Sequence, residues 1–153
     1  THDERLHEYF LWNSVGQPLE ETLAMTSLIY EGIMDDFPKL KIIVAHGGGY
    51  LPYYAGRTDK AYESRAETRT NISHRPSDYL SRFFYDTVVF DRDVLALLVK
   101  KAGDKQVMMG TDYPRGEIEE DPIGFVKKSK TLSRKSKDRI MGLNAAKMFK
   151  VKA

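Results

Sequence analysis

"IIVAHGGGYLP", residues 42–52, is the stretch that decides the fold of this sequence. Its first residues are apolar and mostly β-branched, and a short continuous run of this kind is typical of a strand buried on both faces of a parallel sheet. The run ends at His46, and Gly47, Gly48 and Gly49 follow. Glycine accepts positive φ and lets backbone approach a ligand closely. We therefore expect His46 to stand at the mouth of a binding site.

The rest of the chain repeats this alternation of strand-like and helical segments. The pattern predicts strands at 41–46, 83–89 and 106–110, and helices at 19–36, 52–67, 92–101 and 133–149. Strands that alternate with helices are typical of parallel β/α units, so the fold class is α/β. The sequence contains no repeat and no Ser/Gly linker, so we expect one domain over 1–153.

Composition excludes several classes of protein. The 153 residues are 41% hydrophobic and 30% charged, as in ordinary globular proteins. The absence of cysteine excludes thiolate chemistry, so a metal site must use His, Asp or Glu. The net charge of +2 is too small to indicate nucleic-acid binding, and the basic run 127–139 is interpreted as a solvated helix face and loop. We expect no membrane segment, no signal peptide and a cytoplasmic location.

Two polar residues follow predicted strands. His46 ends the strand at 41–46, and Asp112, in "GTDYP", follows the strand at 106–110. Taken alone, each has a plain structural explanation, a hydrogen-bonded histidine or a turn-capping aspartate. The carboxyl ends of parallel strands meet at one rim, so the two side chains are expected to share a site. The three glycines do not match a phosphate-binding loop, since the sequence lacks both GxGxxG and a P-loop lysine.

Together, these motifs resemble a known family. "FPKLKIIVAHGGGYLPYYAGR", "GTDYP" and "LNAAKMF" are similar to the C-terminal half of the amidohydrolase-related (amidohydrolase 2) metal enzymes, whose members include amino-carboxymuconate-semialdehyde decarboxylase. "WNSVGQPLEET" and "RFFYDTVVFD" match the same family in the same order. The resemblance implies the C-terminal part of a (β/α)8 TIM-like barrel of the metal-dependent hydrolase superfamily, with about three parallel strands and four helices.

The resemblance also implies roles for three residues. His46 corresponds to the catalytic histidine beside a metal-bound water, as general base or acid. Asp112 corresponds to an aspartate that ligates the metal and shuttles a proton. Arg57 corresponds to an arginine that binds a substrate carboxylate, whereas an exposed, salt-bridging arginine is the plain alternative. The implied cofactor is one divalent metal, zinc ahead of manganese or iron.

Parts of the family pattern are absent from the sequence. An N-terminal His-x-His and a ligand histidine of the fifth strand are missing, and we expect His2 and His7 to be polar residues on the approach to a helix rather than replacements. The metal itself is therefore not assured in this chain, which is interpreted as a fragment of the barrel.

Several further residues allow two interpretations of their role. Phe90 stands where some decarboxylase members have a histidine, which weakens the decarboxylase assignment. Arg115 and Glu117 are either rim residues or, preferably, exposed loop charges. The aromatic residues Trp12, Tyr50 and Tyr113 either line a pocket or pack in the core.

The predicted function is a metal-dependent hydrolase or carboxy-lyase that acts on a small carboxylated, unsaturated or aromatic acid through a metal-activated water. Decarboxylation comes first, and hydrolysis and hydration use the same groups. The alternative is a truncated, catalytically inactive binding or interaction module. The expected partners are a small carboxylic acid and a second copy of the chain in a homodimer, with neither nucleic acid nor membrane.

Overall fold

The predicted parallel strands are present but short. In the computed structural model, which describes residues 3–114 and 118–151, β1 (Ile43–Val44) pairs in parallel with β2 (Phe84–Tyr85). Ile43 lies opposite Phe84, and Val44 lies opposite Tyr85. Val107 forms a single parallel bridge to Tyr85 on the other side of β2. The order β1, β2 and Val107 confirms three adjacent parallel segments, with β2 in the centre.

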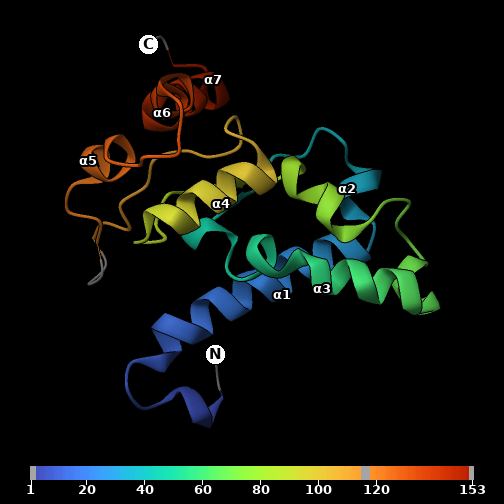
Figure 1. Ribbon diagram of the computed structural model, residues 1–153. Coiled ribbons are helices and arrows are strands. Elements are labelled where there is room, and N and C mark those ends of the chain that lie inside the picture. The colour runs from blue at the N-terminus through green and yellow to red at the C-terminus, as the bar shows by residue number, and fades with distance from the viewer. Residues whose placement is uncertain (1–2, 115–117, 152–153) are drawn as a thin grey trace. The chain divides into compact units, whose positions relative to one another are not determined.

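The chain forms two units, one of residues 1–40 and 48–80 and one of residues 41–47 and 81–153. The first contains η1 (Glu4–Leu6), η2 (Trp12–Gly16), α1 (Gln17–Tyr30), α2 (Ile33–Asp36), α3 (Leu51–Ser64), η4 (Ala66–Arg69) and η5 (Pro76–Arg82, whose last two residues belong to the second unit). The second contains β1, β2, α4 (Arg92–Ala102), α5 (Pro122–Lys127), α6 (Arg134–Asp138), η6 (Arg139–Leu143) and α7 (Asn144–Phe149). The short 3-10 turn η3 (His46–Gly48) spans the boundary (Figure 1).

In the first unit, the helix predicted at 19–36 is two helices. Pro18 lies in the first turn of α1, where its missing N–H costs nothing. The break comes at Gly32, which has φ +77° and approaches the Asn71 carbonyl so closely that a Cβ would lie 2.7 Å from it. Met25 and Ile29 are buried, as their spacing of one helical turn requires.

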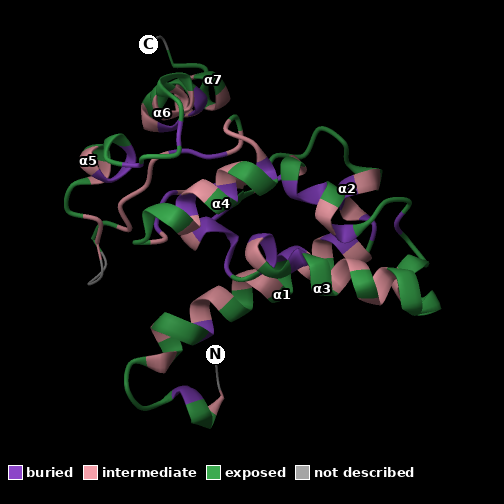
Figure 2. Ribbon diagram, viewed as in Figure 1, coloured by how far each residue is buried: buried purple, intermediate pink, exposed green. Residues whose placement is uncertain are grey.

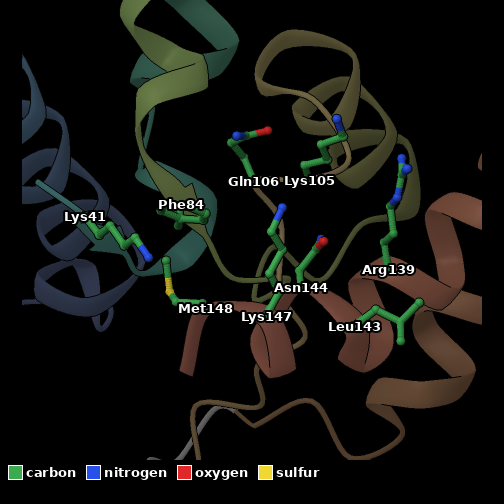
Figure 3. Close-up of a pocket in the computed structure, with 9 residues that line it drawn as sticks. All are labelled: Lys41, Phe84, Lys105, Gln106, Arg139, Leu143, Asn144, Lys147 and Met148. Carbon is green, nitrogen blue, oxygen red and sulfur yellow. The ribbon is translucent and has the colours of Figure 1, made fainter. Parts of the chain in front are cut away.

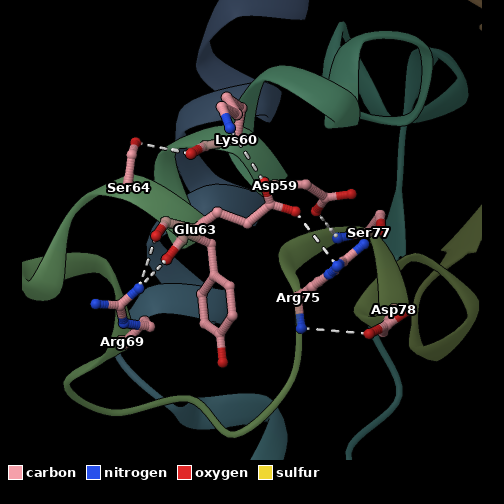
Figure 4. Close-up of polar contacts among 9 residues, drawn as sticks. Asp59, Lys60, Glu63, Ser64, Arg69, Arg75, Ser77 and Asp78 are labelled. Carbon is pink, nitrogen blue, oxygen red and sulfur yellow. Dashed lines mark hydrogen bonds and ion pairs between the residues drawn. The ribbon is translucent and has the colours of Figure 1, made fainter.

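Polar contacts fasten the end of α3 to the segment that follows it (Figure 4). The Arg69 guanidinium donates to the carbonyls of Tyr62 and Glu63, both at 2.9 Å. These carbonyls lie at the end of the helix and have no intrahelical partner of their own. The Glu63 carboxylate also pairs with Arg75 at 3.3 Å. The helix predicted at 52–67 therefore ends at Ser64, and the 3-10 helix η4 follows.

In the second unit, α4 matches its prediction at 92–101 within one residue. The Asp91 carboxylate caps its first turn, and Gly103, with φ +97°, ends it. The predicted C-terminal helix at 133–149 instead contains a π-helical segment, η6, between α6 and α7. There the buried Asn144 amide donates to the carbonyls of Asp104 and Val107, each at 2.7 Å. This contact holds the third strand segment against α7.

The helix α5 was not predicted, although its signal is present in the sequence. Asp121 accepts a hydrogen bond from the Gly124 N–H, and Pro122 follows it directly. An Asp cap followed by proline in the first turn is a common helix start. The helix has only six residues, too few for its apolar period to be visible.

Burial varies along the chain (Figure 2), and it differs between the two residues of β1. Val44 is buried, whereas 45% of the Ile43 surface is exposed. The prediction that this strand is buried on both faces is therefore wrong for Ile43. Within the described part of the chain, no helix has the length and apolar character needed to span a membrane.

Candidate functional site

The structure brings His46 and Asp112 together. His46 lies two residues after β1, and Asp112 follows the strand segment at Val107, so both lie where strands of one sheet end. The His46 Nε2 and the Asp112 Oδ2 are 3.5 Å apart. Their side chains are 21% and 24% exposed, which leaves both within reach of a solute. A protonated imidazole would form an ion pair with the carboxylate at this distance.

Both residues have left-handed backbone conformations, with φ +48° at His46 and φ +61° at Asp112. This region is unfavourable for residues other than glycine, although His and Asp enter it more often than most. Backbone strain of this kind is frequent at functional sites, where it fixes the direction of a side chain. Gly47 and Gly48 continue the left-handed turn after His46, as expected from the sequence.

Gly49 has a different reason to be glycine. Its φ is +63°, and a Cβ built on it would lie 2.2 Å from the Pro18 carbonyl oxygen and 2.8 Å from the Thr22 hydroxyl. The same hydroxyl accepts a hydrogen bond from the Tyr50 N–H at 2.8 Å. The third glycine of the motif thus permits close packing of backbone on α1, inside the first unit.

A third polar residue, Asp86, was not recognised from the sequence. Its carboxylate accepts hydrogen bonds from the N–H groups of His46 (3.0 Å), Gly47 (2.9 Å) and Val88 (3.0 Å). Burial raises the pKa of Asp86, and these three N–H groups oppose that rise. The available signal was an acidic residue inside the apolar run "FFYDTVV".

The neighbouring Thr87 makes a similar contact with the strand segment that lies on the other side of β2. It is almost fully buried, and its hydroxyl accepts a hydrogen bond from the Gly110 N–H at 3.2 Å. A Cβ on Gly110 would lie 3.0 Å from the Asp86 Cβ. The glycine of "GTDYP" therefore leaves room for the Asp86 side chain.

The donor set fits one part of a divalent-metal site. Asp112 is a partly exposed carboxylate, a hard anionic ligand of the kind that divalent ions bind. However, no group of three or more His, Asp or Glu side chains suited to a metal occurs among residues 3–114 and 118–151.

Arg57 lies on α3, in the first unit, with an exposed side chain. No ion pair of its guanidinium occurs within the described ranges. His7 is exposed at the end of η1, as expected of a polar surface residue. His2, Arg115 and Glu117 lie outside the described residues.

The aromatic candidates are exposed rather than packed in the core. Trp12 is 41% exposed and lies edge-on to Phe10. Tyr50 is 40% exposed and donates its hydroxyl to the Val15 carbonyl at 3.2 Å. Tyr113 and Phe90 are also exposed. Core packing therefore does not explain these side chains.

Most of the basic run 127–139 is exposed, as predicted. Some of its charges have partners: Lys128 pairs with Asp121 at 3.3 Å, and Arg139 pairs with Asp104 at 2.8 Å. Partial burial tends to raise the pKa of Asp104, but the Ser136 hydroxyl and the Arg139 guanidinium outweigh it and hold that pKa below its usual value.

A cavity of about 410 Å³ lies in the second unit, and Figure 3 shows the residues that line it. Its lining includes Lys41, which precedes β1, Phe84, which begins β2, and Gln106, which precedes the bridge at Val107. It therefore opens at the amino ends of the strands. Active sites of barrels with parallel strands lie at the carboxyl ends, so this cavity is not the candidate site.

Two curated relatives cover almost the whole chain. The chain is 34% identical over 143 residues to the 2-amino-3-carboxymuconate-6-semialdehyde decarboxylase of Dictyostelium discoideum, an alignment that covers 93% of this chain and 40% of the relative. It is 32% identical over 154 residues to the enzyme of the same name from Caenorhabditis elegans, covering 97% of this chain and 37% of the relative. The chain thus spans about two fifths of the length of these relatives.

Solved structures show the same fold. The 5-carboxyvanillate decarboxylase of Sphingomonas paucimobilis matches 99% of this chain with a TM-score of 0.85 and 24% identity, over 46% of its own chain. The 5-carboxyvanillate decarboxylase of Novosphingobium aromaticivorans, solved with manganese and 4-hydroxy-3-methoxy-5-nitrobenzoic acid, matches 96% of this chain with a TM-score of 0.82 and 25% identity, over 44% of its own chain. The fold is that of part of a TIM-like barrel, as expected.

A profile of the amidohydrolase family matches residues 7–151, and the chain belongs to that family.

Proposed function

We propose that the protein is a metal-dependent decarboxylase of a small unsaturated or aromatic carboxylic acid, with His46 and Asp112 in its active site. The observation that carries the proposal is the 3.5 Å approach of these two side chains at the carboxyl ends of parallel strands. The names of both curated relatives support the reaction, since each is a decarboxylase.

His46 supplies the proton in this proposal. Decarboxylation breaks the bond between the carboxylate carbon and a ring or alkene carbon, and that carbon must gain a proton. The imidazole donates the proton to this carbon, after which the C–C bond breaks, its electron pair restores the double bond, and CO2 leaves. Histidine suits the task because its pKa lies close to neutral pH. Its partial exposure allows the proton to be replaced from water.

Asp112 would hold the divalent ion, and it orients the imidazole through their close contact. When bound, the ion neutralises negative charge on the substrate oxygens. Arg57 binds a substrate carboxylate, because a guanidinium donates two parallel hydrogen bonds to that group. We propose manganese or zinc as the ion; manganese is present in the Novosphingobium aromaticivorans enzyme, and zinc is the ion expected from the sequence.

The experiment is a paired measurement of metal content and turnover on the purified chain, supplied with manganese or zinc. Metal retained after dialysis is measured by mass spectrometry, and CO2 release is followed with 2-amino-3-carboxymuconate-6-semialdehyde as the first substrate. We expect His46→Asn to lower kcat by at least about 100-fold with the metal content unchanged. Asp112→Asn is expected to lower the metal content itself.

His74→Asn is the matched control, because His74 is exposed and its ring lies against Tyr79. This variant should keep both the metal content and the turnover of the parent chain. Turnover that survives His46→Asn would contradict the proposal. A chain that neither retains metal nor turns over substrate would instead support the alternative of a binding module.

A further inference from the structure

β2 is the central strand segment, and the two residues that follow it reach toward both neighbours. The Asp86 carboxylate contacts the turn after β1 through His46 and Gly47. The Thr87 hydroxyl contacts Gly110, two residues before Asp112, with hydrogen bonds of 3.2 and 3.4 Å in both directions. One dipeptide thus lies between the segments that carry the two candidate catalytic groups.

The contact of Asp86 offsets the strain at His46. A left-handed residue other than glycine costs about 1–2 kcal/mol. In this turn the N–H groups of His46 and Gly47 point to the same side, and each bonds to a different oxygen of one carboxylate. Successive N–H groups in such a turn form a concave site for an anion. The carboxylate therefore favours the conformation that directs the imidazole toward Asp112.

The contact of Thr87 restrains the other segment. Gly110 has its N–H and carbonyl both bonded to one buried hydroxyl, so neither of the two peptide groups that flank its Cα can rotate without losing a hydrogen bond. Asp112 follows with φ +61°. The direction of the Asp112 carboxylate therefore depends on a segment that the Thr87 hydroxyl, just after β2, holds in place.

We propose that Asp86 and Thr87 are positioning residues, which act through the backbone to set the 3.5 Å approach of His46 and Asp112. Asp86 fixes the His46 turn, and Thr87 fixes the Gly110 peptide ahead of Asp112. The inference rests on the proposed function for its catalytic meaning. The geometry itself is measurable without substrate or metal.

Two isosteric variants separate the two contacts. Asp86→Asn keeps the shape of the side chain but replaces one acceptor oxygen with an NH2 group that faces an N–H donor. Thr87→Val keeps the volume and removes the hydroxyl. The two variants serve as controls for each other, because they change adjacent residues of the same segment. Asp104→Asn is a further control, since that carboxylate bonds to Ser136 and Arg139 instead.

The measurement is amide hydrogen exchange by NMR, with the amides of α4 as the internal reference. In Asp86→Asn, we expect His46 and Gly47 to exchange about tenfold faster relative to α4, as the loss of a charge-assisted hydrogen bond requires. The Cα chemical shift of His46 should also move away from the value typical of a left-handed residue. In Thr87→Val, the Gly110 amide should show the increase, while His46 changes less. Asp104→Asn should alter neither ratio.

Equal exchange ratios at His46 and Gly47 in wild type and Asp86→Asn would overturn the role of Asp86, and an unchanged Gly110 ratio would overturn that of Thr87. If a variant does not fold, the wild-type chain still gives an answer. A scalar coupling across the hydrogen bond from the His46 nitrogen to the Asp86 carboxyl carbon supports the proposal, and its absence contradicts it. A chain that fails as a decarboxylase leaves these results unchanged, so the two failures are distinguishable.

Discussion

At the residue scale, glycines occur in this chain for several different physical reasons. Gly47 accepts a left-handed turn, Gly49 in addition approaches the Pro18 carbonyl, and Gly110 leaves space for Asp86. Gly56, on α3, has open space where its Cβ would lie. Sequence alone does not distinguish these cases, because the contacts that explain Gly49 and Gly110 are made with residues far along the chain.

The two glycines of the first unit give a matched prediction. Gly49→Ala should destabilise the chain by at least about 1 kcal/mol, because alanine is strained at φ +63° and its Cβ would meet the Pro18 carbonyl. Gly56→Ala should stabilise it by about 0.5–1 kcal/mol, because alanine is the better residue inside a helix. Urea unfolding of both variants measures the difference. The same sign of change in both would contradict this account.

Asp104 gives a prediction for acid stability. Its pKa is lowered in the folded chain, so its ionised form stabilises the fold above the unfolded pKa of about 4 and that contribution is lost as pH falls through the lower, folded pKa. Asp104→Asn should therefore lose less stability than wild type between about pH 5 and pH 2. Ser136→Ala should have an intermediate effect. Chemical denaturation at a series of pH values makes the comparison, and parallel curves would be evidence against it.

At the element scale, helix ends follow local chemistry. α4 begins at Asp91 and ends at Gly103, and both residues mark those ends in the sequence. The long predicted helix at 19–36 ends early, because Gly32 turns the chain against Asn71, which no local pattern reveals. The strands are shorter than their apolar runs for a related reason: pairing extends only as far as a partner strand does.

The cap of α4 gives the prediction at this scale. The Asp91 carboxylate accepts hydrogen bonds from the N–H groups of Asp93 (2.7 Å) and Val94 (3.1 Å). Asp91→Ala should destabilise the chain by about 1 kcal/mol, whereas Asp91→Asn should retain most of the cap. Asp93→Ala is the control for loss of charge near the helix start, with an expected change of about 0.3–1 kcal/mol. Thermal unfolding measures all three, and a larger effect for Asp93→Ala than for Asp91→Ala would refute the prediction.

At the scale of the whole molecule, β1 is an edge strand of the sheet that the described residues form. Among residues 3–114 and 118–151, β1 pairs with β2 alone, and Ile43 on that strand is 45% exposed. Exposed apolar strand edges favour pairing with another chain. This edge is consistent in chemistry with the homodimer expected from the sequence, which stays a prediction.

Self-association should therefore weaken in Ile43→Lys, since lysine on an edge strand opposes edge-to-edge pairing. Ile123→Lys is the control: Ile123 is 48% exposed but lies on the helix α5, which has no open strand edge. Sedimentation equilibrium over a range of concentrations compares both variants with the parent chain. A parent chain that is monomeric throughout, or an equal effect of both substitutions, would remove the support for this edge.

The sequence by itself predicted the three strand segments and the parallel α/β class, because apolar periodicity is a local signal. Its motifs identified the family by resemblance, and the positions of His46 and Asp112 after strands predicted that their side chains lie together. Only the tertiary structure decided where α1 breaks, how short the strands are, and that Asp86 and Thr87 hold the two segments of the site. These depend on contacts between residues that lie tens of positions apart, such as the hydrogen bonds from His46 to Asp86 and from Gly110 to Thr87. A local sequence pattern carries no information about such contacts, because they form only when folding brings two distant segments together.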